Sequence, residues 1–365
     1  MKSLLDPACA GHKWLLAGVL GALLAGCTVA GPSAVRNGRL AYNQAITETD
    51  NQQMLMGVVH SRYDETTTLL AVASVTANVR VTTSTGIELG FGDSDNYAGS
   101  LVPFSAGAVY EENPTISYVP VAGAKYAGQL FSPVRVAVLA ELTGTLAESD
   151  YIFTALIASA NGIRNPDFQY ASVAPDPHFE RFVTLMTTLT QAHRLHWVMD
   201  GSKDGAHSLV IEHFAPELTA EVSELLSLLG LPVPPPDATQ VVVPVFLALN
   251  GRESGGIGLT TRSVGNLVEI LAAAVEVPED DMRRGIAAPY PPPGLAGQHL
   301  RVRYSDDKPS GAAVAVPYRD GWYYIDETDR PTKRFFRLLS ALWSVSMAEG
   351  TAHAAGPVLT VPVSR

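Results

Sequence analysis

Cysteine and positive charge are both scarce in this sequence. Its 365 residues include two cysteines, Cys9 and Cys27, and 25 lysines and arginines are outnumbered by 36 aspartates and glutamates, which gives a net charge of −11. If Cys9 is removed and Cys27 is modified, as argued below, no disulfide, cysteine nucleophile or cysteine-bound metal remains. The acidity and the lack of a basic, aromatic cluster exclude nucleic-acid binding and a polybasic membrane patch. Stability must come from an apolar core, for which 47% hydrophobic residues are ample material.

Motifs of the common enzyme chemistries are also missing. The chain has no Gly-x-Ser-x-Gly elbow, no Walker loop, no His-Glu-x-x-His and no glycine-rich dinucleotide turn, so we expect no cofactor. Four neighbouring histidines could build a zinc site, but their spacing fits poorly, and we predict strand or surface positions and no metal. The four are His193, His196, His207 and His213.

Three groups of acidic residues each have a chemical and a simpler structural interpretation. Asp93 and Asp95 resemble the start of a calcium loop, but Ala98 stands where such a loop needs glycine, so we predict a solvated turn. Two carboxylate pairs could serve acid–base catalysis, although helix capping and backbone binding explain the second pair more simply. The pairs are Glu111 with Glu112, and Asp326 with Asp329.

The N-terminal region has the layout of a bacterial lipoprotein signal. Basic Lys2 and Lys13 precede an apolar run over 14–24, which is too short to span a bilayer comfortably. The run ends in Leu24-Ala25-Gly26-Cys27, which closely resembles the lipobox. We therefore predict cleavage before Cys27 and attachment to the membrane by lipid on that cysteine. Because Thr28 follows in place of aspartate, we expect the outer membrane, with the folded body on its periplasmic face.

Hydrophobic periodicity predicts an α+β fold, with a mixed or antiparallel sheet and packed helices. Helices are expected over 49–63, 124–161, 177–192, 218–229 (closed by Gly230), 263–275 and 330–347. Strands are expected over 69–75, 79–83, 87–91, 106–110, 115–119, 195–199, 208–213, 241–249, 257–261, 302–304, 313–316, 322–325 and 358–363. The run over 241–249 is almost entirely apolar, as in a strand covered on both faces, but Pro244 indicates an edge strand or a bulge.

Composition divides the chain into five segments. A signal peptide over 1–26 and a short tether over 27–37 precede an N-terminal α+β part over 38–231. A proline-rich connector over 232–238 leads to a C-terminal α+β part over 239–365. The two parts form either one compact domain or two halves, and the mature length suits both arrangements.

The C-terminal part contains the clearest local signal. Asp320-Gly321 between two apolar runs predicts a β-hairpin, with the positive φ at the glycine. In the second strand, Trp322 and Tyr324 point to one face and their neighbours to the other. All are apolar or aromatic, so we expect both faces to be covered and Trp322 to be buried. A long buried helix from about 330 is predicted to supply one cover.

Several blocks of this sequence resemble a family of uncharacterised proteobacterial lipoproteins. The most specific is Ala315–Asp326, followed by Lys333 and Phe335. The other blocks are Asn43–Ile46, His60–Asp64, Glu112–Tyr118, Gln129–Pro133 and Thr261–Val264. The resemblance implies that the protein is located in the cell envelope and shares one fold with this family. It implies no catalytic residue.

Arg62, Arg262 and Arg319 occur within these blocks, beside apolar or aromatic residues. Arginine suits buried, bidentate pairing, so we expect structural ion pairs, and an anionic ligand is the alternative. The carboxylates expected to pair with them are Asp64, Glu112 and Asp326.

The sequence favours a non-enzymatic envelope lipoprotein that binds or scaffolds a protein partner. The alternative is a periplasmic hydrolase that acts on a cell-wall or lipid substrate. A deep cleft with convergent carboxylates, histidine and hydroxyls would favour the hydrolase. A broad exposed apolar patch on an acidic protein would favour the partner.

Overall fold

The computed structural model describes two compact units of this chain. The described residues are 40–67, 69–76, 79–87, 104–112, 115–121, 128, 130–145, 148–165, 176–199, 207–248, 255–351 and 359–362. The first unit comprises Met1–Asp50, Leu70–Val119 and Gly356–Arg365, and the second comprises Asn51–Leu69 and Pro120–Ala355. The proline-rich segment 232–238 lies within the second unit, which contains strands from both sides of it.

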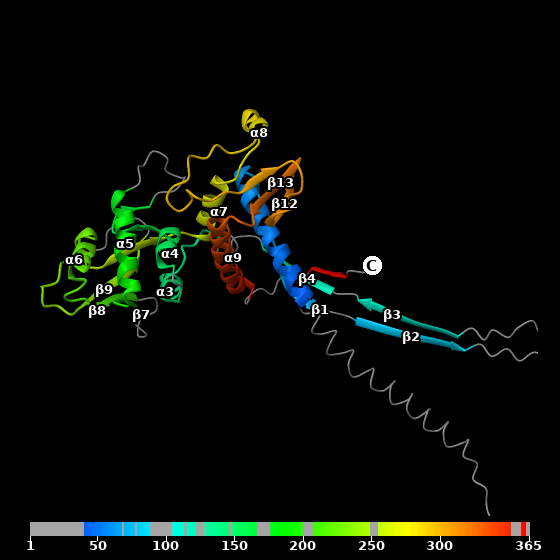
Figure 1. Ribbon diagram of the computed structural model, residues 1–365, viewed down its shortest axis with the longest axis horizontal. Coiled ribbons are helices and arrows are strands. Elements are labelled where there is room, and N and C mark those ends of the chain that lie inside the picture. Colours follow the sequence, from blue (N-terminus) through cyan, green and yellow to red (C-terminus); the bar gives the residue numbers. More distant parts are fainter. Residues whose placement is uncertain are drawn as a thin grey trace, which may run out of the picture. The chain divides into compact units, whose positions relative to one another are not determined.

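Apart from the helix residues 40–50, the described part of the first unit consists of strands. They are β1 (Leu69–Thr76), β2 (Val79–Ile87), β3 (Phe104–Glu112), β4 (Thr115–Val121) and β14 (Leu359–Pro362). β2 and β3 form an antiparallel ribbon that pairs along its whole length, as Figure 1 shows. β4 lies between β1 and β14 in a separate sheet. The β-rich character expected for this region is confirmed.

The second unit is built on a mixed sheet with the strand order β6-β5-β10-β9-β8-β7. The strands are β5 (Ile157–Ala160), β6 (Ile163–Arg164), β7 (Leu195–Met199), β8 (His207–Glu212), β9 (Gln240–Leu247) and β10 (Ile257–Thr261). All neighbours are antiparallel except β9 and β10, which are parallel. The expected helical region up to 161 is wrong at its end, because residues 157–160 form β5 and pair with β10.

Pro244 lies in an interior strand, so its expected place on an edge strand is wrong. β9 pairs with β8 on one side and β10 on the other. The ladder to β10 begins only at Val245, which pairs with Ile257. At Pro244 the strand pairs with β8 alone, where Ser208 lies opposite, although Gly256 just before β10 lies close to the Pro244 carbonyl. The missing amide hydrogen costs no ladder bond toward β10, because that ladder has not yet started.

Helices of the second unit pack on one face of this sheet. They are α3 (Val136–Thr145), α4 (Ser149–Leu156), α5 (Pro177–Gln191) and α6 (Thr219–Leu228). α5 begins with Pro177 after the cap Asp176, whose side chain accepts from the amide of His178. Gly230 follows α6 with a φ of 68°, which confirms its predicted place at the helix end. Apolar strand residues such as Leu209 and Val245 face these helices and are buried.

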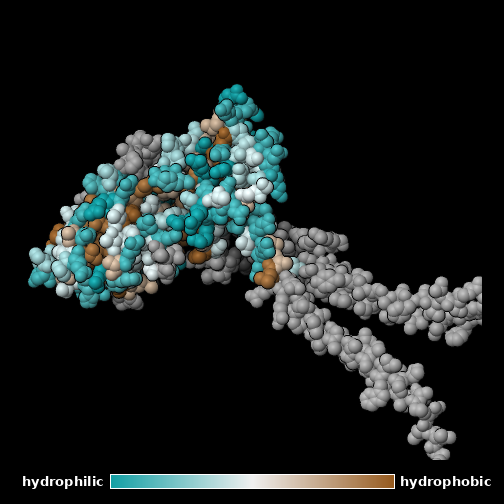
Figure 2. Space-filling view, viewed as in Figure 1, coloured by the Kyte–Doolittle hydropathy of each residue, from teal (hydrophilic) through white to brown (hydrophobic). Residues whose placement is uncertain are grey.

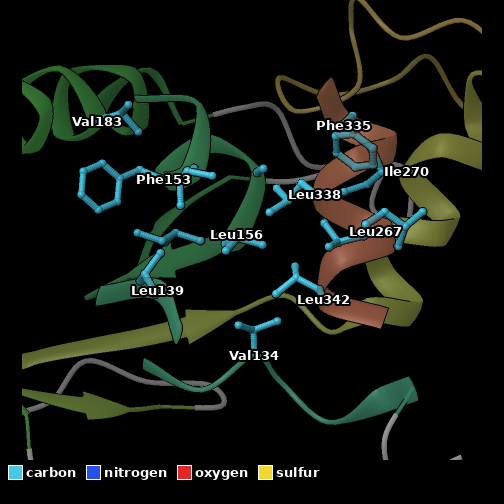
Figure 3. Packing of buried hydrophobic residues seen from close by; sticks show 14 of the residues in the cluster. Val134, Leu139, Phe153, Leu156, Val183, Leu267, Ile270, Phe335, Leu338 and Leu342 are labelled. Atoms are coloured by element: carbon cyan, nitrogen blue, oxygen red, sulfur yellow. The ribbon is translucent and has the colours of Figure 1, made fainter. Parts of the chain in front are cut away.

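A second group of helices completes the core. It consists of α7 (Val264–Ala273), α9 (Arg330–Thr351) and the helix over 40–62, whereas the short α8 (Glu279–Arg284) has no buried residue. Figure 3 shows Leu338 and Leu342 of α9 against Leu267 and Ile270 of α7, with Leu156 of α4 nearby. These five side chains are at most 7% exposed. The core is therefore continuous from the sheet-covering helices to α9.

The helix over 40–62 begins earlier than its expected start at 49. The Thr49 hydroxyl donates to the carbonyls of Ala45 and Ile46 inside the helix, so it does not cap an end there. Within the second unit this helix buries Leu55 and Val58 completely. No helix among the described residues is long and apolar enough to cross a membrane.

The predicted C-terminal hairpin is present in a small antiparallel sheet. β13 (Gly321–Asp326) lies between β11 (Arg303–Ser305) and β12 (Ala312–Tyr318). The positive φ lies at Arg319 (51°), so its expected place at Gly321 is wrong. Glycine is needed at 321 for space, since a Cβ there would lie 2.5 Å from the Tyr304 ring. Tyr304 belongs to β11, and its approach could not be inferred from the turn sequence.

Only one face of β13 is fully covered. Tyr323 and Ile325 are buried, at 1% and 0% exposure, whereas Trp322 and Tyr324 are half-buried. The ammonium of Lys308 lies 5.4 Å from the centre of the Trp322 ring. The expected burial of Trp322 is therefore wrong, and Tyr323 is the aromatic core residue of the hairpin.

Candidate functional site

The residues that carry the predicted anchor lie outside the described part of the chain. They are Leu24, Ala25, Gly26 and Cys27. The Asp93–Ala98 cluster, interpreted as a solvated turn, lies outside it as well. The lipid anchor and the location in the outer membrane therefore stay predictions from the sequence.

Arg262 has a structural role. It is 3% exposed, and its guanidinium donates to the backbone carbonyls of Thr154, Ala155 and Asn165, each at 2.8 Å. Two of these carbonyls lie at the C-terminal end of α4, where a cation is favoured by the helix dipole. Arg262 thereby joins the end of α4 to the segment after β10.

Arg319 is held by aromatic rings and one carboxylate. Its guanidinium lies 4.8 Å from the ring centre of Tyr63 and 5.3 Å from that of Tyr318. It also forms an ion pair with Glu65 at 3.0 Å. This partner differs from the three carboxylates expected from the sequence. The arrangement links the end of the helix over 40–62 to the C-terminal hairpin.

Arg62 is the least satisfied of the three arginines. It is 8% exposed, and its Nε and Nη1 have no hydrogen-bond partner. The guanidinium lies 4.8 Å from the ring centre of Tyr290, and burial lowers the pKa of this arginine. The Tyr290 hydroxyl donates to Glu269 at 2.5 Å. The arginine is thus a buried cation beside an aromatic ring.

Among the described side chains, the four histidines, Asp326 and Asp329 do not converge on a reaction centre, and the side chains of Glu111 and Glu112 lie outside the described part of the chain. No group of three or more metal-ligating side chains occurs among the described residues. His196 lies 3.5 Å from Glu212 on the neighbouring strand. Asp326 accepts from the amide and hydroxyl of Thr328, and Asp329 accepts from the amide and hydroxyl of Thr332 in the first turn of α9. The last two carboxylates therefore organise the start of a helix.

A pocket of about 430 Å³ lies between α4, the loop over 295–300 and the first turn of α9. Its lining combines apolar side chains with basic ones. The lining residues are Tyr151, Thr154, Ala155, Leu295, Ala296, His299, Leu300, Arg330, Pro331 and Arg334. None of them is a carboxylate, although the chain as a whole carries a net charge of −11.

The basic side chains of this pocket are held differently. The guanidinium of Arg334 forms an ion pair with Glu148 at 2.9 Å and lies 5.2 Å from the ring centre of Tyr151. Burial raises the pKa of Tyr151, whose hydroxyl is enclosed and has no hydrogen-bond partner. Arg330, one turn earlier in α9, is exposed, and within the described chain no carboxylate lies within ion-pairing distance of it. One cation is thus fixed in position and another is available.

A hydrogen bond joins two walls of the pocket. The amide of Arg301 donates to the hydroxyl of Thr332 at 2.8 Å, which ties the loop over 295–300 to the first turn of α9. Thr332 is fully buried and also bonds to Asp329. The bond from Arg301 holds the end of the loop beside the first turn of α9.

A second feature is the face of the six-stranded sheet opposite α3–α6. On β9, Val243 and Val245 are buried, whereas Val242 and Phe246 are 56% and 46% exposed. Val198 on β7 is 46% exposed. We call this surface the open face. It comprises His196, Val198, Ser208, Val210, Glu212, Val242, Pro244, Phe246 and Thr260.

Strand register aligns the open face into cross-strand rows. Val210 pairs with Val242 on one side and with His196 on the other. Ser208 pairs with Pro244 and with Val198 in the next row. Val210, Val242 and Pro244 thus lie next to one another on β8 and β9, and Val198 of β7 lies beyond Ser208. Figure 2, by contrast, shows a mostly hydrophilic surface on the visible side of the second unit.

Sequence reasoning missed the pocket and misread the open face. The pocket lining comes from three separated segments, and no local motif joins them. The open face has a signal in the sequence, the apolar run over 241–249, in which exposed and buried apolar residues alternate in the structure. Such a run is typical of a strand covered on both faces, and Pro244 in it indicates an edge strand or a bulge.

Comparison with protein-family models, with curated proteins and with solved structures finds no match to this chain. The family resemblance read from the sequence blocks therefore stays a prediction. Functional inference has to rest on the pocket, the open face and the N-terminal sequence.

Proposed function

We propose that this protein is a lipid-anchored protein of the cell envelope that holds a protein partner on its open face. The anchor is argued from Leu24–Cys27, and its expected location is the periplasmic side of the outer membrane. The observation that carries the partner is the exposed apolar patch over β7, β8 and β9. The partner itself is not named by these observations, but its chemistry is constrained.

The exposed apolar residues favour a partner with an apolar surface. Val198, Val242 and Phe246 each expose about half of their area. Full burial of such a side chain contributes roughly 1.5–3 kcal/mol, so covering the remaining half of all three contributes on the order of 2–4 kcal/mol. Contiguous patches of this kind on a soluble surface mark interaction sites.

The charges of the open face point to an uncharged partner surface. Its ionisable residues, His196 and Glu212, lie 3.5 Å apart at one end. A partner that placed a charged side chain against Val242 would bury that charge without a counter-ion, which is unfavourable. The contact area should therefore be apolar at its centre and polar around it.

The hydrolase alternative gains no support from the described residues. A hydrolase would be expected to have a cleft with convergent carboxylates, histidine and hydroxyls. The pocket contains His299 and Thr154 but no Asp or Glu among its lining residues. Its chemistry suits binding of a negative group better than general acid–base catalysis.

Site-specific photo-cross-linking in intact cells tests the proposal. A photoreactive residue at Val242 of the full-length, lipidated protein should give one discrete adduct of higher mass. Phe246→Asp in the same chain should abolish that adduct, because a charge is placed among the apolar residues of the open face. The matched control is Val233, a valine of similar exposure (52%) in the loop before β9, where no such adduct should form.

Three results would contradict the proposal. Equal labelling from Val233 and Val242 would show unspecific proximity. An adduct that survives Phe246→Asp would place the contact elsewhere. An adduct that contains this chain alone, at twice its mass, would show self-association in place of a different partner.

A further inference from the structure

We propose that the pocket between α4, the loop over 295–300 and α9 binds a small anionic amphiphile. Such a molecule has a carboxylate or phosphate group attached to a short apolar chain. The inference concerns a site that shares no residue with the open face and does not depend on the partner. Its argument rests on the lining and the charges.

The charge of the lining selects the sign of the ligand. Arg330, Arg334 and His299 line the pocket, and no carboxylate does. Arg334 is neutralised by Glu148 beside the pocket, whereas Arg330 has no carboxylate partner within the described chain, so one positive charge at the pocket wall is unpaired in a chain of net charge −11. Guanidinium groups match carboxylate and phosphate oxygens in geometry and charge.

The available cation is Arg330. Arg334 already pairs with Glu148 and rests on the ring of Tyr151, so its position is set before any ligand arrives. Arg330 lies four residues earlier, one turn along the same helix, and has no carboxylate partner within the described chain. An anion between the two would gain one charge-assisted bond that no side chain now makes.

The remaining lining calls for an apolar part of the ligand. Leu295, Leu300 and Ala155 contribute hydrocarbon to the wall. A pocket of about 430 Å³ lies in the size range of small-molecule sites. An inorganic anion would leave most of this volume and its apolar wall uncovered, so a ligand with a hydrocarbon tail fits better.

Two separate sources could supply this chemistry: a free fatty-acid-like carboxylate and a phosphate ester. The test uses short, water-soluble probes that partition little into lipid. They are hexanoate, hexyl phosphate, inorganic phosphate and 1-hexanol. Binding is measured by calorimetry on the full-length lipidated protein in zwitterionic nanodiscs, with empty nanodiscs as the blank.

We expect saturable binding of hexyl phosphate, of hexanoate, or of both, and the tighter of the two identifies the head group. Arg330→Gln should weaken this binding about tenfold or more, since it removes a charge-assisted bond. The variant should still fold, because the side chain of Arg330 is exposed and has no ion pair to lose. Arg337→Gln is the control: this exposed arginine on the same helix does not line the pocket but acts on Tyr151 at a distance, so its variant measures the general electrostatic contribution.

Four outcomes would overturn the inference. Saturable binding of neither amphiphile would remove the site. If 1-hexanol bound as tightly as the anionic amphiphiles, the cations would have no role in binding. If inorganic phosphate bound as tightly, the apolar wall would have none. An equal loss of binding affinity in Arg330→Gln and Arg337→Gln would show that the effect comes from the general charge of the helix and not from a contact of Arg330. None of these results bears on the cross-linking test of the open face.

Discussion

Tyr323→Ala should destabilise the protein far more than Trp322→Ala, although the tryptophan is the larger side chain. Tyr323 is 1% exposed and lies on the covered face of β13, whereas Trp322 is half-buried on the other face. The Tyr323 ring contacts those of Tyr63, Tyr304 and Tyr318, with centroid separations between 5.3 and 6.2 Å. Its removal therefore leaves a cavity among rings that cannot all move into the space.

The expected magnitudes follow from these contacts. Truncation of a buried aromatic residue costs about 3–5 kcal/mol, and each aromatic contact adds about 0.5–1.5 kcal/mol. We therefore expect a loss of about 5 kcal/mol for Tyr323→Ala. Trp322→Ala opens toward water and loses one contact with Lys308, so we expect about 1–2 kcal/mol. Tyr323→Phe removes only the 2.5 Å hydroxyl contact with Tyr63, at about 1 kcal/mol.

Urea unfolding of the unlipidated mature chain, followed by far-UV circular dichroism, distinguishes the three variants. Tyr323→Ala should lower the midpoint by more than about 1 M, and the other two should shift it much less. A larger shift for Trp322→Ala would refute the assignment of the covered face. If Trp322→Ala unfolds like the wild type yet abolishes the cross-link at Val242, the tryptophan contributes to binding.

The remaining predictions concern the anchor, one buried arginine and one ion pair. Cys27→Ser should abolish incorporation of a palmitate analogue, and persistent label would end the lipoprotein hypothesis. On a density gradient the wild type should sediment with outer-membrane markers; recovery with inner-membrane markers would contradict the inference from Thr28. Arg262→Met should cost about 3 kcal/mol in urea unfolding, because two buried carbonyls lose their arginine donor and the Thr154 carbonyl keeps only its bond from Asn165; a loss below about 1 kcal/mol would contradict that role. Tyr318 and Arg319 lower the pKa of Glu65, so the charged form of Glu65 stabilises the folded state. That small contribution should be present at pH 7 and lost below about pH 4, so wild type and Glu65→Gln should differ in stability at pH 7 and converge in acid; a difference that does not change with pH would refute the pair.

Local features of the fold were predictable from the sequence because their causes are local. The hairpin before α9 follows from a two-residue turn between alternating apolar runs. Gly230 ends α6 because it adopts a positive φ readily. The class, α+β with a mixed sheet, follows from the same periodicities.

Features that depend on distant segments were not predictable. Gly321 is required by the ring of Tyr304 from another strand, a contact that no turn rule contains. Arg319 pairs with Glu65, which lies 254 residues away in the chain. The pocket combines α4 with α9 and the loop before β11, so its basic lining appears only after these segments meet.

The apolar run over 241–249 shows how one sequence pattern can have two physical meanings. A strand covered on both faces and a strand with one exposed apolar face have the same composition, because apolar residues point to both sides of each strand. The structure covers Val243 and Val245 and leaves Val242 and Phe246 open. An exposed apolar strand face invites aggregation, and proteins commonly protect such surfaces with charged residues. Among the described residues of the open face, the ionisable side chains are His196 and Glu212 at one end, which agrees with the proposal that a partner covers this surface.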